Sequence, residues 1–346
     1  MKAKHVVPKT AFEGMLATAC LGLITLAGST LAQQGPSGYH LIKTVKIDGP
    51  GGWDYLAIDS ESRRLFISHD THVVVLNADT GDVAGDIAGT PGVHGVAIAS
   101  DLGRGFTSNG DGNNVTIFDL KTLKPIGQVP TGKEPDAIVY DPASHRVFTM
   151  NAGSGTATAI DAAAGKVAGT TKLPGKPEFA VADGHGSVFV NIRSKSELAE
   201  LDSRMMKVTG EWPLAPCKSP SGMAMDTEHG RLFIGCDNKI MAVVDAKSGK
   251  VITTMPIGDG VDANRFDPGT GLAFSSNGDS ETLTVIREDA PDKYTVVENV
   301  KTGEGARTME VDPKTHNVYL VTAKLVPSKP YPKPASGTVQ LLIFAK

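Results

Sequence analysis

The stretch Asn77-Ala-Asp-Thr-Gly-Asp82 recurs along the chain and decides the fold. Related six-residue segments begin with Asp and follow at intervals of 42, 42, 41 and 43 residues, at 119–124, 161–166, 202–207 and 245–250. A second frame has the same spacing and places a polar residue five positions before an Asp. Its pairs are Asp54/Asp59, Asp136/Asp141, Glu178/Asp183, Ser221/Asp226, Asp262/Asp267 and Arg307/Asp312, and His94 keeps the phase without the closing Asp. A period of about 40–45 residues filled with short strands is typical of propeller blades.

The repeat predicts an all-β fold, a seven-bladed β-propeller of four-stranded antiparallel blades spanning residues 39–346 as a single domain. The third copy serves as a template, with strands expected at 137–140, 146–150, 156–160 and 166–173. The last copy lacks a fourth strand, whereas residues 39–48 precede the first copy and have the character of one. We therefore expect the N-terminal strand to pair into the last blade and close the ring, which removes open sheet edges.

Composition agrees with many short strands joined by turns. The chain has 346 residues, of which 40% are hydrophobic, with 39 Gly and 21 Pro. Outside the N-terminus, no stretch keeps a helical period. This balance favours a turn-rich β protein over a helical one.

The N-terminus has the pattern of a secretory signal peptide. Lys2, Lys4 and Lys9 precede an apolar run over 15–27, and small residues follow at 30–32. We interpret residues 1–32 as a cleaved signal and 33–38 as a short linker, which predicts a periplasmic or secreted protein. A retained membrane anchor or a lipoprotein modified at Cys20 are the alternatives. After cleavage no membrane span is expected.

Loss of the signal makes the chain more acidic. Three Lys and one Glu leave, so the formal charge of −4 becomes −4 − (3 − 1) = −6. Nucleic-acid binders usually carry a basic face, because counterion release from phosphates supplies much of their affinity. The acidic balance argues against nucleic acid as a partner. We expect a monomer.

Two cysteines remain after cleavage, Cys217 and Cys236. In an oxidising compartment they predict a disulfide that closes a loop of about twenty residues and contributes about 3 kcal/mol of stability. Two free thiols in a core are the alternative.

Laying the copies over one another separates scaffold from candidate site. The Asp-x-x-x-Gly-Lys turns repeat in most blades and are assigned to structure, together with His145, His229 and His316. The first-strand entries differ from blade to blade and should form a ring around the central channel, on the end called here the entry face. This channel ring consists of Asp54, His94, Asp136, Glu178, Ser221, Asp262 and Arg307.

The channel ring could bind a small ligand, a divalent cation or a protein partner. Its four carboxylates suit a hard or cationic ligand, and His94 could act as a metal ligand or a base. If a metal binds, His94, Glu178 and Asp262 are the candidate ligands. The alternative is that these side chains cap strand ends around a water-filled channel.

Two further features are expected on the entry face. One is a set of polar residues between the second and third strands, which suits turn positions with positive φ: His69, Asp70, Asn109, Asn151, Asn191, Asp237 and Asn277. The other is a proline-rich arm, residues 324–336, which could be a lid, a partner-docking arm or a permissive insertion.

Familiar catalytic and cofactor motifs are missing from the sequence. No Cys-x-x-Cys-His is present, which excludes covalent haem attached through that motif. No Gly-rich phosphate loop follows a strand, and neither Gly-x-Ser-x-Gly nor His-Glu-x-x-His occurs. The cofactor remains unknown, a divalent cation being one possibility.

Five segments around the strand entries share a Gly- or Pro-containing approach to a polar residue: Pro91-Gly-Val-His-Gly95, Gly103-Arg-Gly-Phe-Thr-Ser-Asn-Gly110, Lys176-Pro-Glu-Phe-Ala-Val-Ala-Asp-Gly184, Gly258-Asp-Gly-Val-Asp-Ala263 and Gly305-Ala-Arg-Thr-Met309. These segments resemble the YncE-like family of exported bacterial propellers with YVTN-type repeats. The resemblance covers the mature chain and implies a seven-bladed propeller in the periplasm. The strict repeat is altered here, since Phe-Thr-Met-Asn151 and Phe-Val-Asn191 replace Tyr-Val-Thr-Asn.

Three functions follow from these observations. The first is a non-enzymatic binding protein that uses the entry face. The second is a metal-dependent hydrolase of the lactonase type, in which Arg307 would stabilise an oxyanion. The third is an accessory to a periplasmic redox enzyme.

Overall fold

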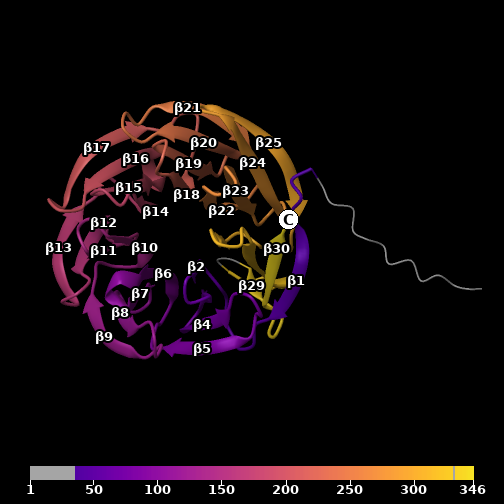
Figure 1. The fold of residues 1–346 in the computed structure, drawn as a ribbon. Helices are drawn as coiled ribbons and strands as arrows, with labels where there is room; N and C mark the ends of the chain where they lie inside the picture. Colours follow the sequence, from indigo (N-terminus) through magenta and orange to yellow (C-terminus); the bar gives the residue numbers. More distant parts are fainter. Residues whose placement is uncertain (1–35, 330–331) are drawn as a thin grey trace, which may run out of the picture. The chain divides into compact units, whose positions relative to one another are not determined.

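Seven four-stranded antiparallel sheets form a ring in the computed structural model, which describes residues 36–329 and 332–346. The described residues belong to one compact unit. The signal peptide expected at 1–32 and the first part of the linker lie outside them. Figure 1 shows the inner strands around the centre and the outer strands along the rim. The predicted seven-bladed propeller is therefore confirmed.

The first six blades are consecutive meanders. Blade 1 has β2 (Leu56–Asp59), β3 (Arg64–His69), β4 (His72–Asn77) and β5 (Val83–Ala88), and blade 2 has β6 (Val93–Ala99), β7 (Arg104–Asn109), β8 (Asn114–Asp119) and β9 (Pro125–Pro130). Blade 3 has β10 (Pro135–Asp141), β11 (Arg146–Asn151), β12 (Thr156–Asp161) and β13 (Lys166–Lys172), and blade 4 has β14 (Pro177–Ala182), β15 (Ser187–Ile192), β16 (Glu197–Asp202) and β17 (Lys207–Pro213). Blade 5 has β18 (Pro220–Asp226), β19 (Arg231–Cys236), β20 (Ile240–Asp245) and β21 (Val251–Pro256), and blade 6 has β22 (Val261–Asp267), β23 (Leu272–Asn277), β24 (Thr282–Ala290) and β25 (Lys293–Lys301).

The seventh blade closes the ring with strands from both ends of the domain. It contains β26 (Met309–Val311), β27 (Val318–Thr322), β30 (Gln340–Ala345) and β1 (His40–Lys46), and β1 pairs antiparallel with β30. The expected closure by the N-terminal strand is confirmed. A small hairpin of β28 (Leu325–Val326) and β29 (Lys333–Pro334) interrupts this blade. The helical elements of the described chain are two 3-10 turns, η1 (Ser100–Leu102) and η2 (Arg193–Lys195), and no helix in this part is long and apolar enough to cross a membrane.

Burial follows the position of each strand in its blade. The second and third strands are covered by neighbouring blades on both faces, so β3 and β4 are almost wholly buried. The outer strands are mostly exposed, as β5 shows. In β3 and β4 the buried positions form nearly continuous apolar runs, Leu65–Ile67 and Val73–Leu76.

The two sequence frames correspond to two kinds of turn. The Asn77 side-chain oxygen accepts hydrogen bonds from the backbone N–H groups of Asp79 and Thr80, both at 2.9 Å. The fifth residue of this motif has a left-handed backbone in every copy, with φ between 55° and 70°, at Gly81, Leu123, Gly165, Met206 and Gly249. Glycine adopts that conformation without steric cost, so the repeat is set by turn geometry.

The closing Asp of the second frame also caps a turn. Asp59, for example, accepts a hydrogen bond from the N–H of Glu61, two residues on. His145 and His316 follow such an Asp and occupy left-handed positions, with φ of 52° and 63°. His229 instead contacts the closing Asp226 through its ring, with Nδ1 2.6 Å from the carboxylate.

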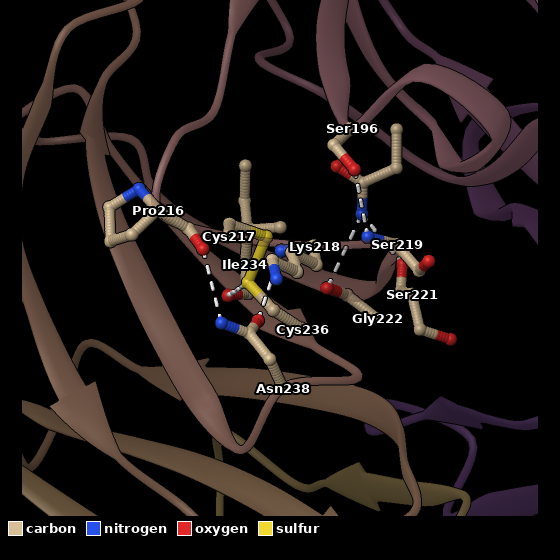
Figure 2. The surroundings of a disulfide bond; sticks show 11 residues. Ser196, Pro216, Cys217, Lys218, Ser219, Ser221, Gly222, Ile234, Cys236 and Asn238 are labelled. Carbon is tan, nitrogen blue, oxygen red and sulfur yellow. Dashed lines mark hydrogen bonds between the residues drawn. A yellow bond between two sulfur atoms is a disulfide. The ribbon is translucent and has the colours of Figure 1, made fainter.

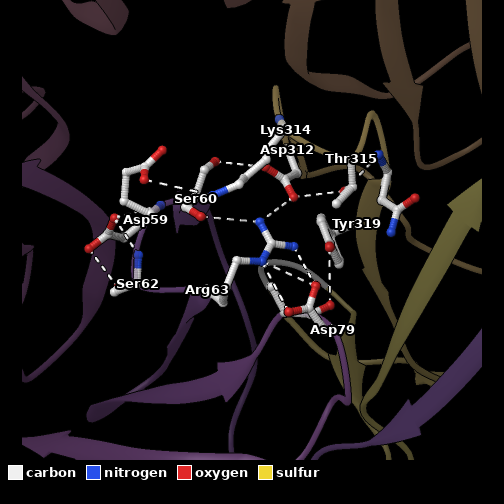
Figure 3. Close-up of polar contacts among 12 residues, drawn as sticks. Asp59, Ser60, Ser62, Arg63, Asp79, Asp312, Lys314, Thr315 and Tyr319 are labelled. Carbon is white, nitrogen blue, oxygen red and sulfur yellow. Dashed lines mark hydrogen bonds and ion pairs between the residues drawn. The ribbon is translucent and has the colours of Figure 1, made fainter.

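Ring closure is reinforced by a polar cluster between blade 7 and blade 1 (Figure 3). Arg63 donates to Asp312 at 2.6 Å and to Asp79 at 2.6 Å, and Ser60 donates to Asp312 at 2.7 Å. The Asp312 side chain is fully buried, and its charge is matched by the Arg63 guanidinium. The two ends of the domain are thus joined by side chains as well as by the β1–β30 ladder.

The asparagines expected at positive-φ turn positions have a different role. Asn109, Asn151, Asn191 and Asn277 lie within the second strands and are fully buried, and none of them has a positive φ. The left-handed position falls near the start of the third strand instead, for example at Asn113. The side chain of Asn109 donates to Asn114 at 2.7 Å and to Thr116 at 2.9 Å. In that set only Asp70 has the expected backbone, with φ 57°.

Candidate functional site

A cavity of about 1090 Å³ lies on the entry face. Five of the seven channel-ring residues line it, namely Asp136, Glu178, Ser221, Asp262 and Arg307. Turns between second and third strands contribute Asp70, Arg193, Asp237 and Asp279, and the arm contributes Leu325, Pro332, Lys333 and Pro334. Strand-one entries, these turns and the arm therefore share one face, as the blade topology requires.

Backbone hydrogen bonds between blades fix the positions of the channel ring. Tyr55 N–H donates to the His94 carbonyl at 3.0 Å, and Ala263 N–H donates to the Arg307 carbonyl at 3.1 Å. Side chains do the same at other junctions, since Thr308 donates to the Asp54 carbonyl at 2.9 Å. The backbones of Asp54, His94 and Arg307 are thus each hydrogen-bonded to a neighbouring blade.

The first group in the ring combines Asp54, His94 and Asp136 from blades 1, 2 and 3. His94 Nδ1 lies 2.6 Å from Asp54 Oδ2 and 3.7 Å from Asp136 Oδ1. Burial lowers the pKa of His94, but the hydrogen bond to Asp54 and the charges of both carboxylates outweigh it and raise the pKa to about 9. One imidazole nitrogen therefore faces two carboxylates.

The second group joins blades 5, 6 and 7. Asp262 accepts a hydrogen bond from Ser221 Oγ at 2.9 Å and one from Arg307 Nε at 3.1 Å. The Arg307 guanidinium also donates to the Trp53 carbonyl at 3.1 Å and lies over the Trp53 ring, 5.3 Å from its centroid. Burial raises the pKa of Asp262 although Arg307 opposes the shift. Arg307 is thus held by an acid and an aromatic ring, which fixes its guanidinium at the cavity wall.

The third group is centred on Arg193, which the sequence repeat did not single out. Its guanidinium lies 3.6 Å from Glu178 and 2.8 Å from Asp237. Glu178 accepts no hydrogen bond from any residue in the described ranges, and its side chain is only 15% exposed. Burial and the Asp136 charge raise the pKa of Glu178 to about 8, in spite of Arg193.

The carboxylates outnumber their cationic partners. The cavity is lined by seven Asp or Glu residues and four Lys or Arg residues. Asp136 has His94 beside it at 3.7 Å and accepts no side-chain hydrogen bond in the part of the chain that the structure describes. Burial raises the pKa of Asp136 to about 6, against the opposing charge of His94. The two carboxyl groups whose pKa values are raised, Asp136 and Glu178, thus lie in adjacent blades, and a cation bound between them would favour the charged form of both.

An aromatic contact crosses the channel one residue beyond the ring. Tyr55 of blade 1 and Phe179 of blade 4 have ring centroids 4.9 Å apart. Arg265 of blade 6 lies over Phe179 at 5.4 Å and pairs with Glu310 at 2.8 Å. These side chains come from blades 1, 4, 6 and 7, so the contacts of Phe179 with Tyr55 and Arg265 join blades that are not neighbours in the ring.

The arm forms part of the cavity wall. Its hairpin is anchored by Leu325 N–H, which donates to the Glu304 carboxylate at 3.2 Å, and by Ala335 N–H, which donates to the Lys324 carbonyl at 2.8 Å. Pro334 lies against Gly52, where an added Cβ would meet the proline ring at 4.0 Å. The arm therefore lies over the first-blade entry.

A disulfide joins Cys217 to Cys236, with Cα atoms 5.5 Å apart (Figure 2). It links the loop before β18 to the end of β19. The same loop is tied to blade 4 by Ser219 N–H, which donates to Ser196 Oγ at 3.0 Å. The disulfide and this hydrogen bond thus restrain residues 217–219, which directly precede Ser221 in the chain.

The three candidate metal ligands taken from the sequence are not gathered in one place. In the described residues, two sets of three side chains have ligand atoms within 4.8 Å of one another. One is Asp54, His94 and Asp136. The other is Glu288 in β24 of blade 6 together with Asp226 and His229, at the turn after the first strand of blade 5. His94 lies beside Asp54 and Asp136. Glu178 instead lies beside Arg193, and Asp262 pairs with Arg307.

Together, the blades and the entry-face cavity define a seven-bladed β-propeller, an architecture suited to a binding scaffold. No family model matches the chain, and no curated protein matches its sequence. Among solved structures, hydrazine synthase of Kuenenia stuttgartiensis is similar over 80% of this chain and 94% of that one, with a TM-score of 0.70 and 15% identity. The WD40 repeats of RRP9 match with a TM-score of 0.74 and 8% identity, covering 90% of this chain and 99% of that one. U3-55K matches over the same shares, with a TM-score of 0.72 and 8% identity. These similarities establish the fold alone.

Proposed function

We propose that this chain is an exported, periplasmic propeller of the YncE-like type that binds a small organic cation in its entry-face cavity. Support for export comes from the sequence of residues 1–32 and from the disulfide, because disulfides persist in oxidising compartments. Support for the family comes from the segments around His94, Glu178, Asp262 and Arg307.

One observation carries the proposed ligand class. Asp136 and Glu178 line the cavity in adjacent blades, and neither carboxylate accepts a side-chain hydrogen bond from another described residue. Their cationic neighbours, His94 at 3.7 Å from Asp136 and Arg193 at 3.6 Å from Glu178, lie beyond hydrogen-bond distance, so both partly buried carboxyl groups can still accept hydrogen bonds from a ligand. A ligand ammonium group would supply both the charge and the N–H donors.

The rest of the cavity suits a small molecule better than a broad protein surface. Its volume of about 1090 Å³ is just above the usual range for ligand pockets, about 300–1,000 Å³. Trp53 adds an aromatic side chain to its lining. Arg307 and Lys333 on the wall could donate hydrogen bonds to a carboxylate or hydroxyl group of the same ligand.

The experiment is a calorimetric titration of the full chain with three probes of different charge: spermidine, glucose and citrate. Spermidine should bind, and citrate and glucose should not. Glu178→Gln and Asp136→Asn should each weaken spermidine binding about ten- to a hundredfold, as expected for losing a charge-assisted hydrogen bond. Glu61→Gln, an exposed carboxylate outside the cavity, is the matched control.

Two results would contradict the proposal. One is tighter binding of citrate than of spermidine. The other is spermidine binding that Glu61→Gln weakens as much as Glu178→Gln does, which would mean non-specific attraction to an acidic protein.

A further inference from the structure

The group formed by Asp54, His94 and Asp136 has the composition of a transition-metal site. We infer that it binds one divalent metal ion of the first transition row. Zn²⁺ and Mn²⁺ are the ions with which we would test this site. This inference goes beyond the organic-cation proposal and does not depend on it.

The donor atoms converge on a small space. His94 Nδ1 lies 2.6 Å from Asp54 Oδ2 and 3.7 Å from Asp136 Oδ1, and the three ligand atoms all fall within 4.8 Å of one another. Ligand atoms about 2.0–2.2 Å from a common ion are separated by about 3–4 Å, so small side-chain movements would complete the site. A single Nδ1 proton can be donated to only one of the two carboxylates at full strength, whereas an ion would be shared by all three ligands.

The backbones of these three residues are already ordered. Asp54 N–H donates to the Ser68 carbonyl at 3.1 Å, and the His94 carbonyl accepts from Tyr55 N–H at 3.0 Å. The Asp136 carbonyl accepts a hydrogen bond from Ser108 Oγ. Three blades therefore present the ligands from fixed positions, which reduces the entropy lost on binding.

The absence of a side chain at Gly110 leaves room for the imidazole ring of His94. A Cβ at Gly110 would come within 2.6 Å of His94 Nε2 and 2.9 Å of Cδ2. With a side chain at this position, the imidazole ring would have to move away from its place beside the two carboxylates. Gly110 does not have a positive φ, so a glycine is not required there by backbone conformation. Its absence of a side chain serves the placement of His94.

The donor set selects the class of metal. One imidazole nitrogen with two carboxylate oxygens suits Zn²⁺, Mn²⁺ or Fe²⁺, whereas Ca²⁺ and Mg²⁺ prefer oxygen ligands alone. His94 is 37% exposed and Asp136 lines the cavity, so an ion held here would be reachable from the entry face.

The test is calorimetric titration of the full chain, first stripped with chelator, with ZnCl₂, MnCl₂ and CaCl₂. We expect one Zn²⁺ or Mn²⁺ per chain at the ring and much weaker Ca²⁺ binding. His94→Gln should lower the affinity at least about a hundredfold, since changing even an outer-shell partner of a metal ligand typically costs ten- to a hundredfold.

His229→Gln is the matched control. His229 also has Nδ1 2.6 Å from an aspartate, in the second three-residue set, but it lies among the turns on the opposite face. This variant should leave the affinity of the channel-ring site for Zn²⁺ and Mn²⁺ unchanged. Gly110→Ala is the second variant; it retains all three ligands and should lower the affinity by displacing the imidazole, which keeps the test decisive if His94→Gln fails to fold.

The inference is overturned if the wild-type chain takes up neither Zn²⁺ nor Mn²⁺ stoichiometrically, if Ca²⁺ binds equally well, or if His94→Gln and Gly110→Ala leave the affinity unchanged. Spermidine binding by the chelator-stripped chain is measured in parallel. Uptake of Zn²⁺ without spermidine binding would refute the organic-cation proposal alone, and the reverse result would refute the metal site alone.

Discussion

Replacing Glu178 with glutamine should stabilise the protein at neutral pH and leave it nearly unchanged in acid. The carboxyl group of Glu178 is 15% exposed, and burial and the nearby Asp136 charge raise its pKa to about 8. Since the folded pKa is above the unfolded one, the folded state favours the protonated acid. Below about pH 4.5 Glu178 is protonated in both states and does not lower the free energy of unfolding. As the pH rises from 4.5 toward 8, the unfolded state is increasingly favoured because only there does Glu178 ionise readily, and the free energy of unfolding falls.

The magnitude follows from the two pKa values. With an unfolded pKa of 4.5 and a folded pKa of about 8, the cost of Glu178 to folding is below about 1 kcal/mol at pH 5 and about 4 kcal/mol at pH 7.5. Glutamine has a similar shape and does not ionise. The difference in unfolding free energy between Glu178→Gln and wild type should therefore grow by about 3 kcal/mol between these pH values.

Urea unfolding at pH 5.0 and pH 7.5, followed by circular dichroism, measures this difference. Glu61→Gln is the control, because the Glu61 side chain is 89% exposed and the same substitution there should give parallel curves. If the stability difference between Glu178→Gln and wild type is the same at both pH values, the buried, donor-poor environment assigned to Glu178 is wrong. A gain in stability together with weaker spermidine binding would mean that the protein keeps a destabilising acid for its ligand.

Three other substitutions probe features outside Glu178. Gly110→Ala should move the His94 ring and shift the imidazole resonances of that residue in a histidine-labelled NMR spectrum, while the spectra of other histidines stay unchanged. Replacing both disulfide cysteines with alanine should lower the unfolding free energy by about 3 kcal/mol, a loss that reductant reproduces in the wild type but not in the variant. Arg63→Leu should cost about 3 kcal/mol or more in urea unfolding, because it leaves the fully buried Asp312 carboxylate without its guanidinium; Lys46→Leu, which breaks an exposed pair, should cost less than 1 kcal/mol.

The fold could be predicted from the sequence because the repeated residues are those that the turns of each blade require. Each turn needs an Asx side chain and a left-handed residue at a fixed offset, as at Asn77 and Gly81, and these needs recur in successive blades. The closing role of β1 also followed from counting strands. The error over Asn109 and its equivalents arose because Asn suits both a left-handed turn and a buried hydrogen-bond position, and residue type alone does not separate the two.

The site could be predicted only in part. Strand-one position places Asp136, Glu178 and Asp262 on one ring, but it does not say which side chains pair across blade junctions. Arg193 reaches Glu178 from a turn fifteen residues later in the sequence, and its rotamer decides that contact. The Tyr55–Phe179 contact joins blades 1 and 4 across the channel, and a repeat that describes neighbouring strands contains no information about it.

The pairing of β1 with β30 has a consequence for the timing of biosynthesis. The first outer strand, β1, is synthesised early, and its partner β30 is complete only when residue 345 has been made, 345 − 46 = 299 residues later. At about 5–20 residues per second, that interval lasts roughly 15–60 s. Until residue 309 has been made, the seventh blade lacks three of its four strands, β26, β27 and β30, and Arg63 lacks its Asp312 partner until shortly before the end. A chain that ends between residues 322 and 340 would therefore contain the strands of six complete blades and a seventh blade without β30, so β1 would have no strand to pair with.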